Sequence, residues 1–334
     1  MQNFMLHHLR VESVAETTVL LNEYKGSAIR GALFNALRGP LRPARDGYVG
    51  FCMNKEAPSC WDCPLHQGCP VSTLVATLDT SQRGHGRYAP RPYIIRPPLD
   101  EGKLVYQRGE SFTFDFALCA EALLLFPYVV LSLERLGHEG LGKRVEENRW
   151  QRGRLRIRRL ETIHPLSGER QEVRGENQLM VQMPDLPVTH ADVLAEAARL
   201  PASGRLTLHF HTPMRLISKK RTLKSPHFRV LFHRLITRLE ELSRRFSNTP
   251  LVLDVPPLLD LADKVQLVAN ETRWVNLRSY STRLKRDTPI GGLVGKAVYE
   301  AEDWRPFLPW LVWGCLLGVG KNTVKGDGWY SIKM

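Results

Sequence analysis

An internal repeat of the secondary-structure pattern constrains the fold of this 334-residue chain more than any other feature. Alternating apolar residues predict strands, and apolar residues three or four positions apart predict helices. Each half reads strand, helix, strand, strand, helix, strand. In the first half these segments are 4–12, 25–38, 92–98, 111–118, 119–136 and 154–160. In the second half they are 206–216, 225–246, 274–283, 291–301, 304–318 and 328–334.

Two successive βαββαβ units predict an α+β fold of tandem ferredoxin-like domains, the plan that also underlies the RRM sheet. We expect an N-terminal domain at 1–162, a polar, proline-dotted linker at 163–203 and a C-terminal domain at 204–334. In the sequence alone, the stacking aromatics of an RRM are not recognisable.

The charge balance indicates a polyanionic partner. Lys and Arg number 47 against 34 Asp and Glu, which gives a formal charge of +13. Such a surplus favours nucleic acid over an anionic membrane surface. The N-terminus reads as a strand and not as a secretory signal. The longest apolar stretches are interrupted by proline or glutamate and are short for a membrane span. We therefore expect a cytoplasmic protein without a membrane partner.

A glycine-rich segment, GVGKNTVKGDG at 318–328, predicts a loop that contacts phosphate. Its glycines and lysines are Gly318, Gly320, Lys321, Lys325, Gly326 and Gly328. A nucleotide P-loop requires GxxxxGK[ST] between a strand and a helix. Here Cys315 and Asn322 occupy two of the required positions, and Thr323 breaks the GxGxxG pattern. A nucleic-acid backbone remains as the ligand, and a tight turn with solvated lysines is the alternative.

The loop resembles the C-terminal glycine-rich signature of the RAMP superfamily of CRISPR proteins. The repeated βαββαβ order, the segment KGSAIRGAL and the segment YSTRLKRDTPIGGLVGKAVYE resemble one branch of it. That branch is the Cas-six family of endoribonucleases, which process CRISPR precursor RNA. The resemblance covers nearly the whole chain.

The resemblance implies cleavage of CRISPR repeat RNA without a metal or other cofactor. The ribose 2′-hydroxyl would attack the adjacent phosphate and leave a 2′,3′-cyclic phosphate. The loop lysines and loop amides would contact the RNA backbone. Implied partners are repeat RNA, the mature crRNA and other Cas proteins of an effector complex in a prokaryotic cytoplasm.

The catalytic residues follow the family pattern less closely. The family usually places a histidine in or near the first helix, and SAIRGALFNALR has none. Tyr24, Lys25 and Arg30 lie in that neighbourhood: Lys25 or Arg30 would neutralise the scissile phosphate and Tyr24 would position the 2′-hydroxyl. The alternative is that Arg30 pairs with an acidic neighbour and Tyr24 packs in the core. His85, between glycines and arginines, is a further candidate for proton transfer.

Basic segments elsewhere predict RNA binding, although a charge run can also be a solvated face. The candidates with site roles are Lys219, Lys220, Arg221, Arg283 and Lys285. The strand 154–160 carries further arginines at alternate positions. His209 and His211 also alternate on one strand, where they either face RNA or are satisfied within the sheet.

An insertion at 51–70 holds four cysteines with the spacing C-x7-C-x2-C-x5-C. They are Cys52, Cys60, Cys63 and Cys69. Four thiolates suit a structural, tetrahedral zinc ion and leave no open position for catalysis. His66 is a substitute ligand. An iron–sulfur cluster and unliganded cysteines are the alternatives.

The leading function is therefore an endoribonuclease that matures CRISPR RNA. The missing helix histidine leaves open a non-catalytic RAMP subunit that binds crRNA in a ribonucleoprotein. A general RNA-binding protein outside CRISPR is a third reading.

Overall fold

The structure, a computed structural model, describes residues 4–40, 44, 46–75, 90–100, 102–281 and 286–333. Antiparallel sheets and helices occur together, which confirms the α+β class. The chain divides into two units. Unit 1 comprises Met1–Met5, Pro165–Gly168 and Val188–Met334, and unit 2 comprises Leu6–His164 and Glu169–Pro187.

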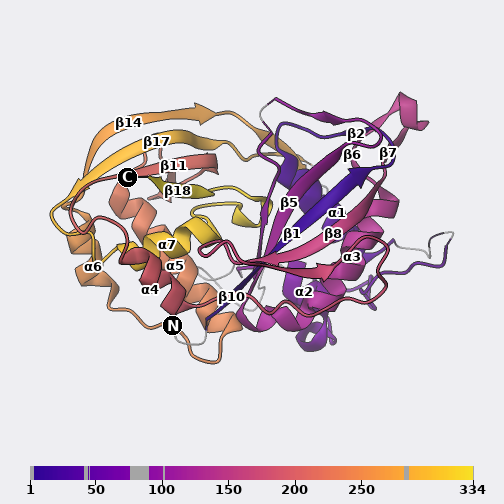
Figure 1. Ribbon diagram of the computed structural model, residues 1–334, viewed down its shortest axis with the longest axis horizontal. Coiled ribbons are helices and arrows are strands. Elements are labelled where there is room, and N and C mark those ends of the chain that lie inside the picture. Colours follow the sequence, from indigo (N-terminus) through magenta and orange to yellow (C-terminus); the bar gives the residue numbers. More distant parts are fainter. Residues whose placement is uncertain are drawn as a thin grey trace. The chain divides into compact units, whose positions relative to one another are not determined.

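The main sheet of unit 2 has the strand order β3-β5-β1-β8-β9 with antiparallel neighbours (Figure 1). Its strands are β1 (Leu6–Ala15), β3 (Tyr93–Arg96), β5 (Ser111–Cys119), β8 (Leu155–Ile163) and β9 (Arg170–Arg174). The two long helices of the unit are α1 (Lys25–Arg38) and α3 (Phe126–Glu139). Their apolar faces pack together and against this sheet, so the core of unit 2 lies between them.

A second, smaller sheet in unit 2 has the order β4-β2-β6-β7. Its strands are β2 (Val19–Leu20), β4 (Val105–Tyr106), β6 (Leu141–Val145) and β7 (Gln151–Gly153). The remaining helical turns are α2 (Pro70–Val75), η1 (His66–Gly68), η2 (Ala120–Leu125) and η3 (Glu146–Asn148).

Helix α1 forms because its apolar residues recur at helical spacing on one face. Ile29, Leu33 and Leu37 are buried, and they lie four residues apart. The helix ends at Gly39, whose φ is +72°. A Cβ atom at Gly39 would lie 2.1 Å from the backbone oxygen of Val49. Glycine is therefore required where the chain crosses the end of the helix.

Unit 1 contains a four-stranded antiparallel sheet with the order β14-β17-β11-β18. Its strands are β11 (Gly204–Met214), β14 (Gln266–Val275), β17 (Gly292–Ala301) and β18 (Tyr330–Lys333). The helices of the unit are α4 (His190–Ala197), α5 (Phe228–Phe246), α6 (Val255–Ala262) and α7 (Leu308–Leu317). Figure 1 shows them along one side of the sheet. The two-residue strand β10 spans Pro187–Val188.

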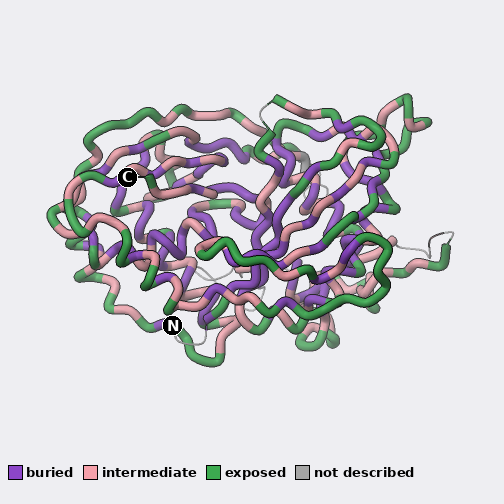
Figure 2. The backbone as a smooth tube through the Cα atoms, in the orientation of Figure 1, coloured by how far each residue is buried: buried purple, intermediate pink, exposed green. Residues whose placement is uncertain are grey.

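Aromatic rings fill the core of unit 1. Phe228 on α5 makes edge contacts with Trp304 and Phe307, with ring centroids 5.5 and 5.2 Å apart. On β11, residues Leu206, Leu208 and Phe210 are buried, and the residues between them are half-buried. Figure 2 shows the same alternation of burial along the strands. The sheet therefore turns its apolar face to the helices, as the period of two requires.

Two short hairpins extend from unit 1. One pairs β12 (Ile217–Ser218) with β13 (Arg221–Thr222), and the other pairs β15 (Arg278–Ser281) with β16 (Arg286–Pro289). The strand expected at 274–283 is thus the end of β14 followed by β15. Strand β14 begins at Gln266, and most of its side chains are exposed because it is an edge strand. An edge strand without a buried face lacks the apolar alternation that identifies a strand in sequence.

The segment 163–203, expected as a linker, is divided between the two units. It contains β9 and α4. Helix α4 is preceded by a capping box in which the Thr189 and Asp192 side chains each accept from the other residue's backbone amide.

Candidate functional site

The glycine-rich loop needs all four of its glycines for backbone geometry. The φ angles of Gly318, Gly320, Gly326 and Gly328 are +70°, +92°, +91° and +72°. Such values place residues in the left-handed region that only glycine adopts without strain. Between them, the turn η4 spans Thr323–Lys325. The shape of the loop is therefore encoded locally by the glycine spacing.

Backbone hydrogen bonds fix this loop to the end of β11. The amide of Lys321 donates to the oxygen of Arg215 at 3.1 Å, and the amide of Gly328 donates to the oxygen of Pro213 at 3.1 Å. The amide of Val319 donates to the oxygen of Gly328 at 3.0 Å. These three amides are used inside the protein, so they would not bind a phosphate beside the loop. The Lys321 side chain is exposed.

Arg215 connects the loop to both hairpins. Its Nη1 donates to the backbone oxygen of Pro289 at 3.1 Å, and its Nη2 donates to Oγ1 of Thr222 at 3.3 Å. A Cβ at Gly320 would lie 2.6 Å from the backbone oxygen of Arg215, so the loop approaches Arg215 closely. Sequence reasoning missed Arg215, because a single arginine after a strand carries no motif.

The β12–β13 hairpin presents lysines at its turn. Lys219 and Lys220 have φ values of +47° and +64°, and both side chains are exposed. A tight hairpin turn with two positive φ values usually selects Asn and Gly, so lysines there carry backbone strain. Arg221 follows and is also exposed. Backbone strain at exposed cations suggests that this turn has a function. The turn lies on the hairpin that Arg215 holds beside the glycine-rich loop.

The other basic segment predicted to bind RNA joins β15 to β16. Arg283 and Lys285 lie outside the described residues. Near the base of that hairpin, the ammonium of Lys224 lies 3.1 Å from the ring centroid of Trp274, a cation–π contact. In unit 2, by contrast, the arginines of β8 form ion pairs. Arg156 and Arg158 both contact Glu176.

Two of the residues predicted for catalysis lie at the start of α1. Tyr24 precedes the helix and is buried. Lys25 is buried as well, and its ammonium donates to the backbone oxygen of Asp100 and to the hydroxyl of Tyr106, each at 3.1 Å. Burial lowers the pKa of Lys25, although Asp100 opposes the shift. The Tyr106 hydroxyl donates in turn to the Asp100 carboxylate at 2.8 Å. The Lys25 amine is therefore held within the fold.

Arg30 lies one turn further along α1 and is half-buried. Its guanidinium lies 5.4 Å from the ring centroid of Phe34. Within the described part of the chain, Arg30 forms no ion pair and its Nε has no hydrogen-bond partner. The fourth catalytic candidate, His85, lies outside the described residues.

A histidine near the N-terminus is committed to a buried hydrogen bond, and burial lowers its pKa. His8 Nε2 lies 3.0 Å from Oδ2 of Asp115, whose carboxylate also accepts from Arg10 at 2.9 Å. Burial alone would raise the pKa of Asp115, but the hydrogen bonds from His8 and Arg10 hold it well below its usual range.

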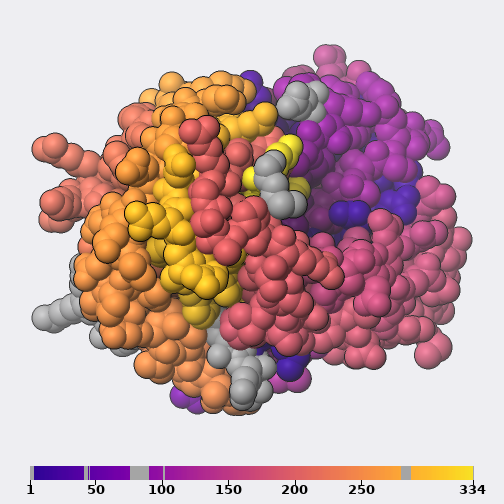
Figure 3. Space-filling view, turned by 60° about the vertical axis from the view of Figure 1, so that its left-hand side comes forward, coloured from indigo at the N-terminus to yellow at the C-terminus, as the bar shows by residue number. Residues whose placement is uncertain are grey.

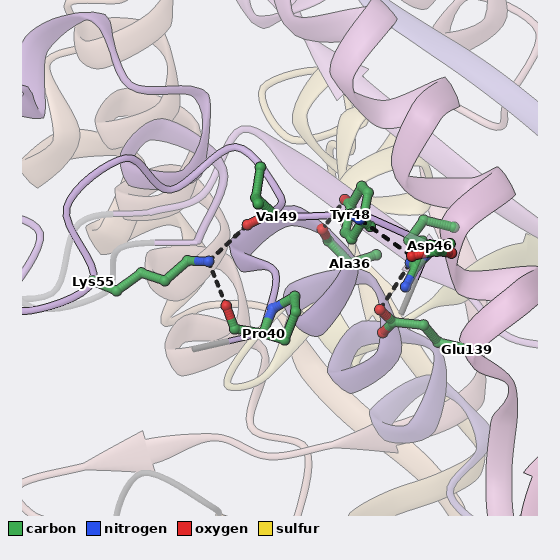
Figure 4. A network of polar contacts seen from close by, with 8 residues as sticks. Ala36, Pro40, Asp46, Tyr48, Val49, Lys55 and Glu139 are labelled. Carbon is green, nitrogen blue, oxygen red and sulfur yellow. Dashed lines mark hydrogen bonds and ion pairs between the residues drawn. The ribbon is translucent and has the colours of Figure 1, made fainter. Parts of the chain in front are cut away.

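The cysteine-bearing segment is tied down by the polar network in Figure 4. The Tyr48 hydroxyl donates to the oxygen of Ala36, and the Lys55 ammonium donates to the oxygen of Val49 at 2.7 Å. Arg135 on α3 pairs with Asp46 and lies 4.1 Å from the Tyr48 ring centroid. The network therefore links the start of the cysteine-bearing segment to α1 and α3.

Within this segment, three of the cysteines act electrostatically on the fourth, Cys60. Burial raises the pKa of the Cys60 thiol, and Cys69, Cys52 and Cys63 raise it further. All four thiols are half-buried and none forms a disulfide. They are the donor set that zinc prefers. As placed, however, no group of three or more His, Cys, Asp or Glu side chains in the described ranges could hold a metal ion.

Comparison with known proteins was made by sequence family and by structure. A family model named AF_1859_N, an N-terminal domain, matches residues 4–186. A model of the CRISPR-associated endoribonuclease Cas6 matches residues 208–330, the part that contains the glycine-rich loop and both hairpins. A search of curated proteins gives no match.

Solved structures of Cas6 proteins share the fold. A product complex of a Thermus thermophilus Cas6 superposes with a TM-score of 0.54 at 16% identity, covering 98% of this chain and 99% of that one. A second Cas6 product complex gives 0.51 at 16%, covering 99% and 100%. A partial Cas6-RT-Cas1–Cas2 complex gives 0.57 at 12% identity, covering 99% of this chain and 46% of that one.

These structural matches show that the α+β fold of this chain is the fold of the Cas6 structures. Together with the sequence match over the loop and hairpins, they confirm the resemblance. The chain belongs to the Cas6 family of CRISPR-associated endoribonucleases. Among the described residues, none of the helices has the length and apolarity that crossing a membrane would require.

Proposed function

We propose that this Cas6-family protein cleaves CRISPR repeat RNA without a metal ion and leaves a 2′,3′-cyclic phosphate. The model of the Cas6 endoribonuclease that matches residues 208–330 supports an RNA-cleaving enzyme. The main support for the proposal is that the glycine-rich loop and a basic hairpin meet at Arg215 in unit 1. Hydrogen bonds there join the glycine-rich loop to the hairpin that exposes Lys219 and Lys220. Exposed cations at these positions would hold the RNA backbone by its phosphates.

The reaction needs three tasks from side chains. The 2′-hydroxyl loses its proton while O2′ bonds to phosphorus, and the bond from phosphorus to O5′ breaks as O5′ gains a proton. Tyr24 would position the 2′-hydroxyl, and His85 would move a proton. Arg30 is our choice for the charge on the pentacoordinate phosphorus, with Lys25 second because its amine is already held by two hydrogen bonds. The phosphates of the RNA backbone would also contact further basic residues: Arg221, Lys321, Lys325, Arg283 and Lys285.

Repeat RNA and its mature crRNA product are the proposed partners, together with other Cas proteins. Two of the similar structures are Cas6 product complexes, and a third contains Cas6, Cas1 and Cas2. We also propose tandem ferredoxin-like domains with a cysteine-rich insertion. Its support is that the main sheets of the two units have the same strand order. When the four strands of each set are numbered along the chain, β14-β17-β11-β18 and β3-β5-β1-β8 both read 2-3-1-4.

A chimeric RNA substrate tests the mechanism. We expect the protein to cut a labelled repeat RNA in EDTA and to release a product ending in a 2′,3′-cyclic phosphate. A single 2′-deoxy substitution at the cleavage site is expected to abolish cutting, because the nucleophile is gone, and to leave binding intact. The same substitution one nucleotide away is the control. Cutting of the deoxy substrate, or dependence on added Mg²⁺, would refute this mechanism.

A structural zinc ion is the second proposal, since four thiols with C-x7-C-x2-C-x5-C spacing lie in one short segment. Purified protein is expected to contain about one zinc per chain. Cys60→Ser should lose most of this zinc, whereas Cys315→Ser, outside the segment, should keep it. Equal zinc content in the two variants, metal-free wild type, or iron in place of zinc would contradict the assignment.

Two observations favour a second function, a non-catalytic RAMP subunit that binds crRNA. Helix α1 has no histidine, and the Lys25 amine at its start is held by Asp100 and Tyr106. Such a subunit would bind repeat RNA with the same salt dependence and leave it uncut, so the product analysis above separates the two functions.

A further inference from the structure

The sheet of unit 1 has a face that its helices do not use. Along β11, Leu206, Leu208 and Phe210 point into the core. The alternate residues, His209 and His211 among them, lie on the opposite face. Figure 1 shows the helices of this unit on one side of the sheet only.

Three rings form a continuous row on this face. The ring centroids of His209 and His211 are 4.4 Å apart, and those of His211 and Trp329 are 5.3 Å apart. Trp329 immediately precedes β18, and its backbone oxygen accepts from the His211 amide at 2.9 Å. All three rings are half-buried, so each keeps part of its surface exposed. Figure 3 shows residues from the C-terminal end of the chain at the surface of unit 1.

Two lysines accompany the rings. Lys296 on β17 lies directly opposite His209, and Lys333 on β18 lies opposite Thr207. Both side chains are exposed. Burial lowers the pKa of His209, and the charges of Lys333 and Lys296 lower it further, which places both ammonium groups near the ring. One acidic residue, Glu271 on β14, lies opposite Lys296.

The position of the rings argues against a purely structural role. A hydrogen bond between its Nε2 and Oγ of Ser331, at 2.8 Å, orients the His211 ring. The core of the unit is already filled from the other face by Phe228, Phe232 and Phe307. Partly exposed rings beside exposed lysines are instead the composition that binds single-stranded nucleic acid by stacking and phosphate contacts.

We propose that this sheet face binds a single-stranded stretch of RNA, with bases stacked on Trp329, His211 and His209 and phosphates held by Lys296 and Lys333. The inference rests on the proposed function, because the strand it would hold is an unpaired part of the repeat RNA. Trp329 directly follows Gly328, so the face is continuous with the glycine-rich loop.

Binding of a ten-nucleotide oligouridine, measured by fluorescence anisotropy, tests the proposal. His211→Ala and Trp329→Ala should each weaken binding by about 5- to 150-fold, since stacking contributes about 1–3 kcal/mol per base. Trp329→Phe should keep most of the affinity. Combined Lys296→Ala and Lys333→Ala should reduce the salt slope of log K by about 1.4, because each single-strand phosphate contact contributes about 0.7. His233→Ala on α5 is the matched control and should bind as wild type.

The outcomes separate this inference from the proposed function. If Trp329→Ala and His211→Ala fold by circular dichroism and bind oligouridine like wild type, the sheet face is not an RNA site, whether or not repeat RNA is cut. If Trp329→Phe is as weak as Trp329→Ala, the loss is not one of stacking and the proposal is also refuted. If wild type leaves repeat RNA uncut but the alanine variants lose oligouridine, the cleavage proposal fails and the binding face stands.

Discussion

Replacing Gly328 with alanine is expected to disrupt the glycine-rich loop and to lower the free energy of unfolding by about 3–5 kcal/mol. The φ of this residue is +72°, and a Cβ there would lie 1.8 Å from the backbone oxygen of Val319. Backbone must move to relieve that overlap, which breaks the hydrogen bonds between Val319 and Gly328 and between Gly328 and Pro213. Denaturant unfolding measures the loss, and repeat-RNA affinity should fall with it.

Gly204→Ala is the matched control for this substitution. Gly204 belongs to the same unit and has a φ of +83°, but a Cβ there would meet nothing within 4 Å. Only the strain of the left-handed conformation applies, and it costs about 1 kcal/mol. RNA affinity should stay at the wild-type value. Equal losses of stability in the two variants would show that close packing of the loop contributes nothing beyond its φ angles.

The comparison of these glycines shows what a sequence can reveal about a loop. The spacing of Gly318, Gly320, Gly326 and Gly328 indicates a turn with positive φ values, because backbone conformation is a local property. The contact between Gly320 and the oxygen of Arg215 is not local, since it joins segments from the two ends of unit 1. The sequence around either residue does not predict its contact with the other, so the role of Arg215 is seen only in the folded structure.

The same distinction explains the strands. The buried alternation of β11 and β17 predicts both strands, whereas β14 escaped prediction because an edge strand with exposed side chains has no apolar period. The row of rings on the outer face was hidden for another reason. Trp329 immediately precedes β18 and His211 lies on β11, and only the pairing of these two strands brings the rings together.

The catalytic residues are the part of the site that the sequence leaves most open. The family pattern points to the first helix, and Tyr24, Lys25 and Arg30 lie there. Residue type alone gives Lys25 and Arg30 equal claims as cations for the scissile phosphate. Their surroundings differ: the Lys25 amine donates two buried hydrogen bonds, and Arg30 forms no ion pair in the described part of unit 2. We therefore expect substitution of Arg30 to lower the cleavage rate and substitution of Lys25 to lower the stability.

Arg30→Met is expected to slow single-turnover cleavage of repeat RNA by about 100- to 1,000-fold, the usual effect of removing one preorganised donor from a transition state. Its free energy of unfolding should change by less than about 0.5 kcal/mol, since Arg30 makes no ion pair in the described residues. Arg30→Lys should restore part of the rate. A wild-type rate for Arg30→Met would remove Arg30 from the mechanism.

Lys25→Met is expected to show the reverse pattern. It leaves the Tyr106 hydroxyl and the Asp100 carbonyl without their buried donor, which costs about 1–3 kcal/mol of unfolding free energy. The cleavage rate per folded molecule should stay near that of wild type, because the amine is committed to the fold and not to the substrate. A large rate loss with unchanged stability would instead mean that Lys25 leaves Asp100 and Tyr106 when RNA binds, and Lys25 would then replace Arg30 as the cation at the scissile phosphate.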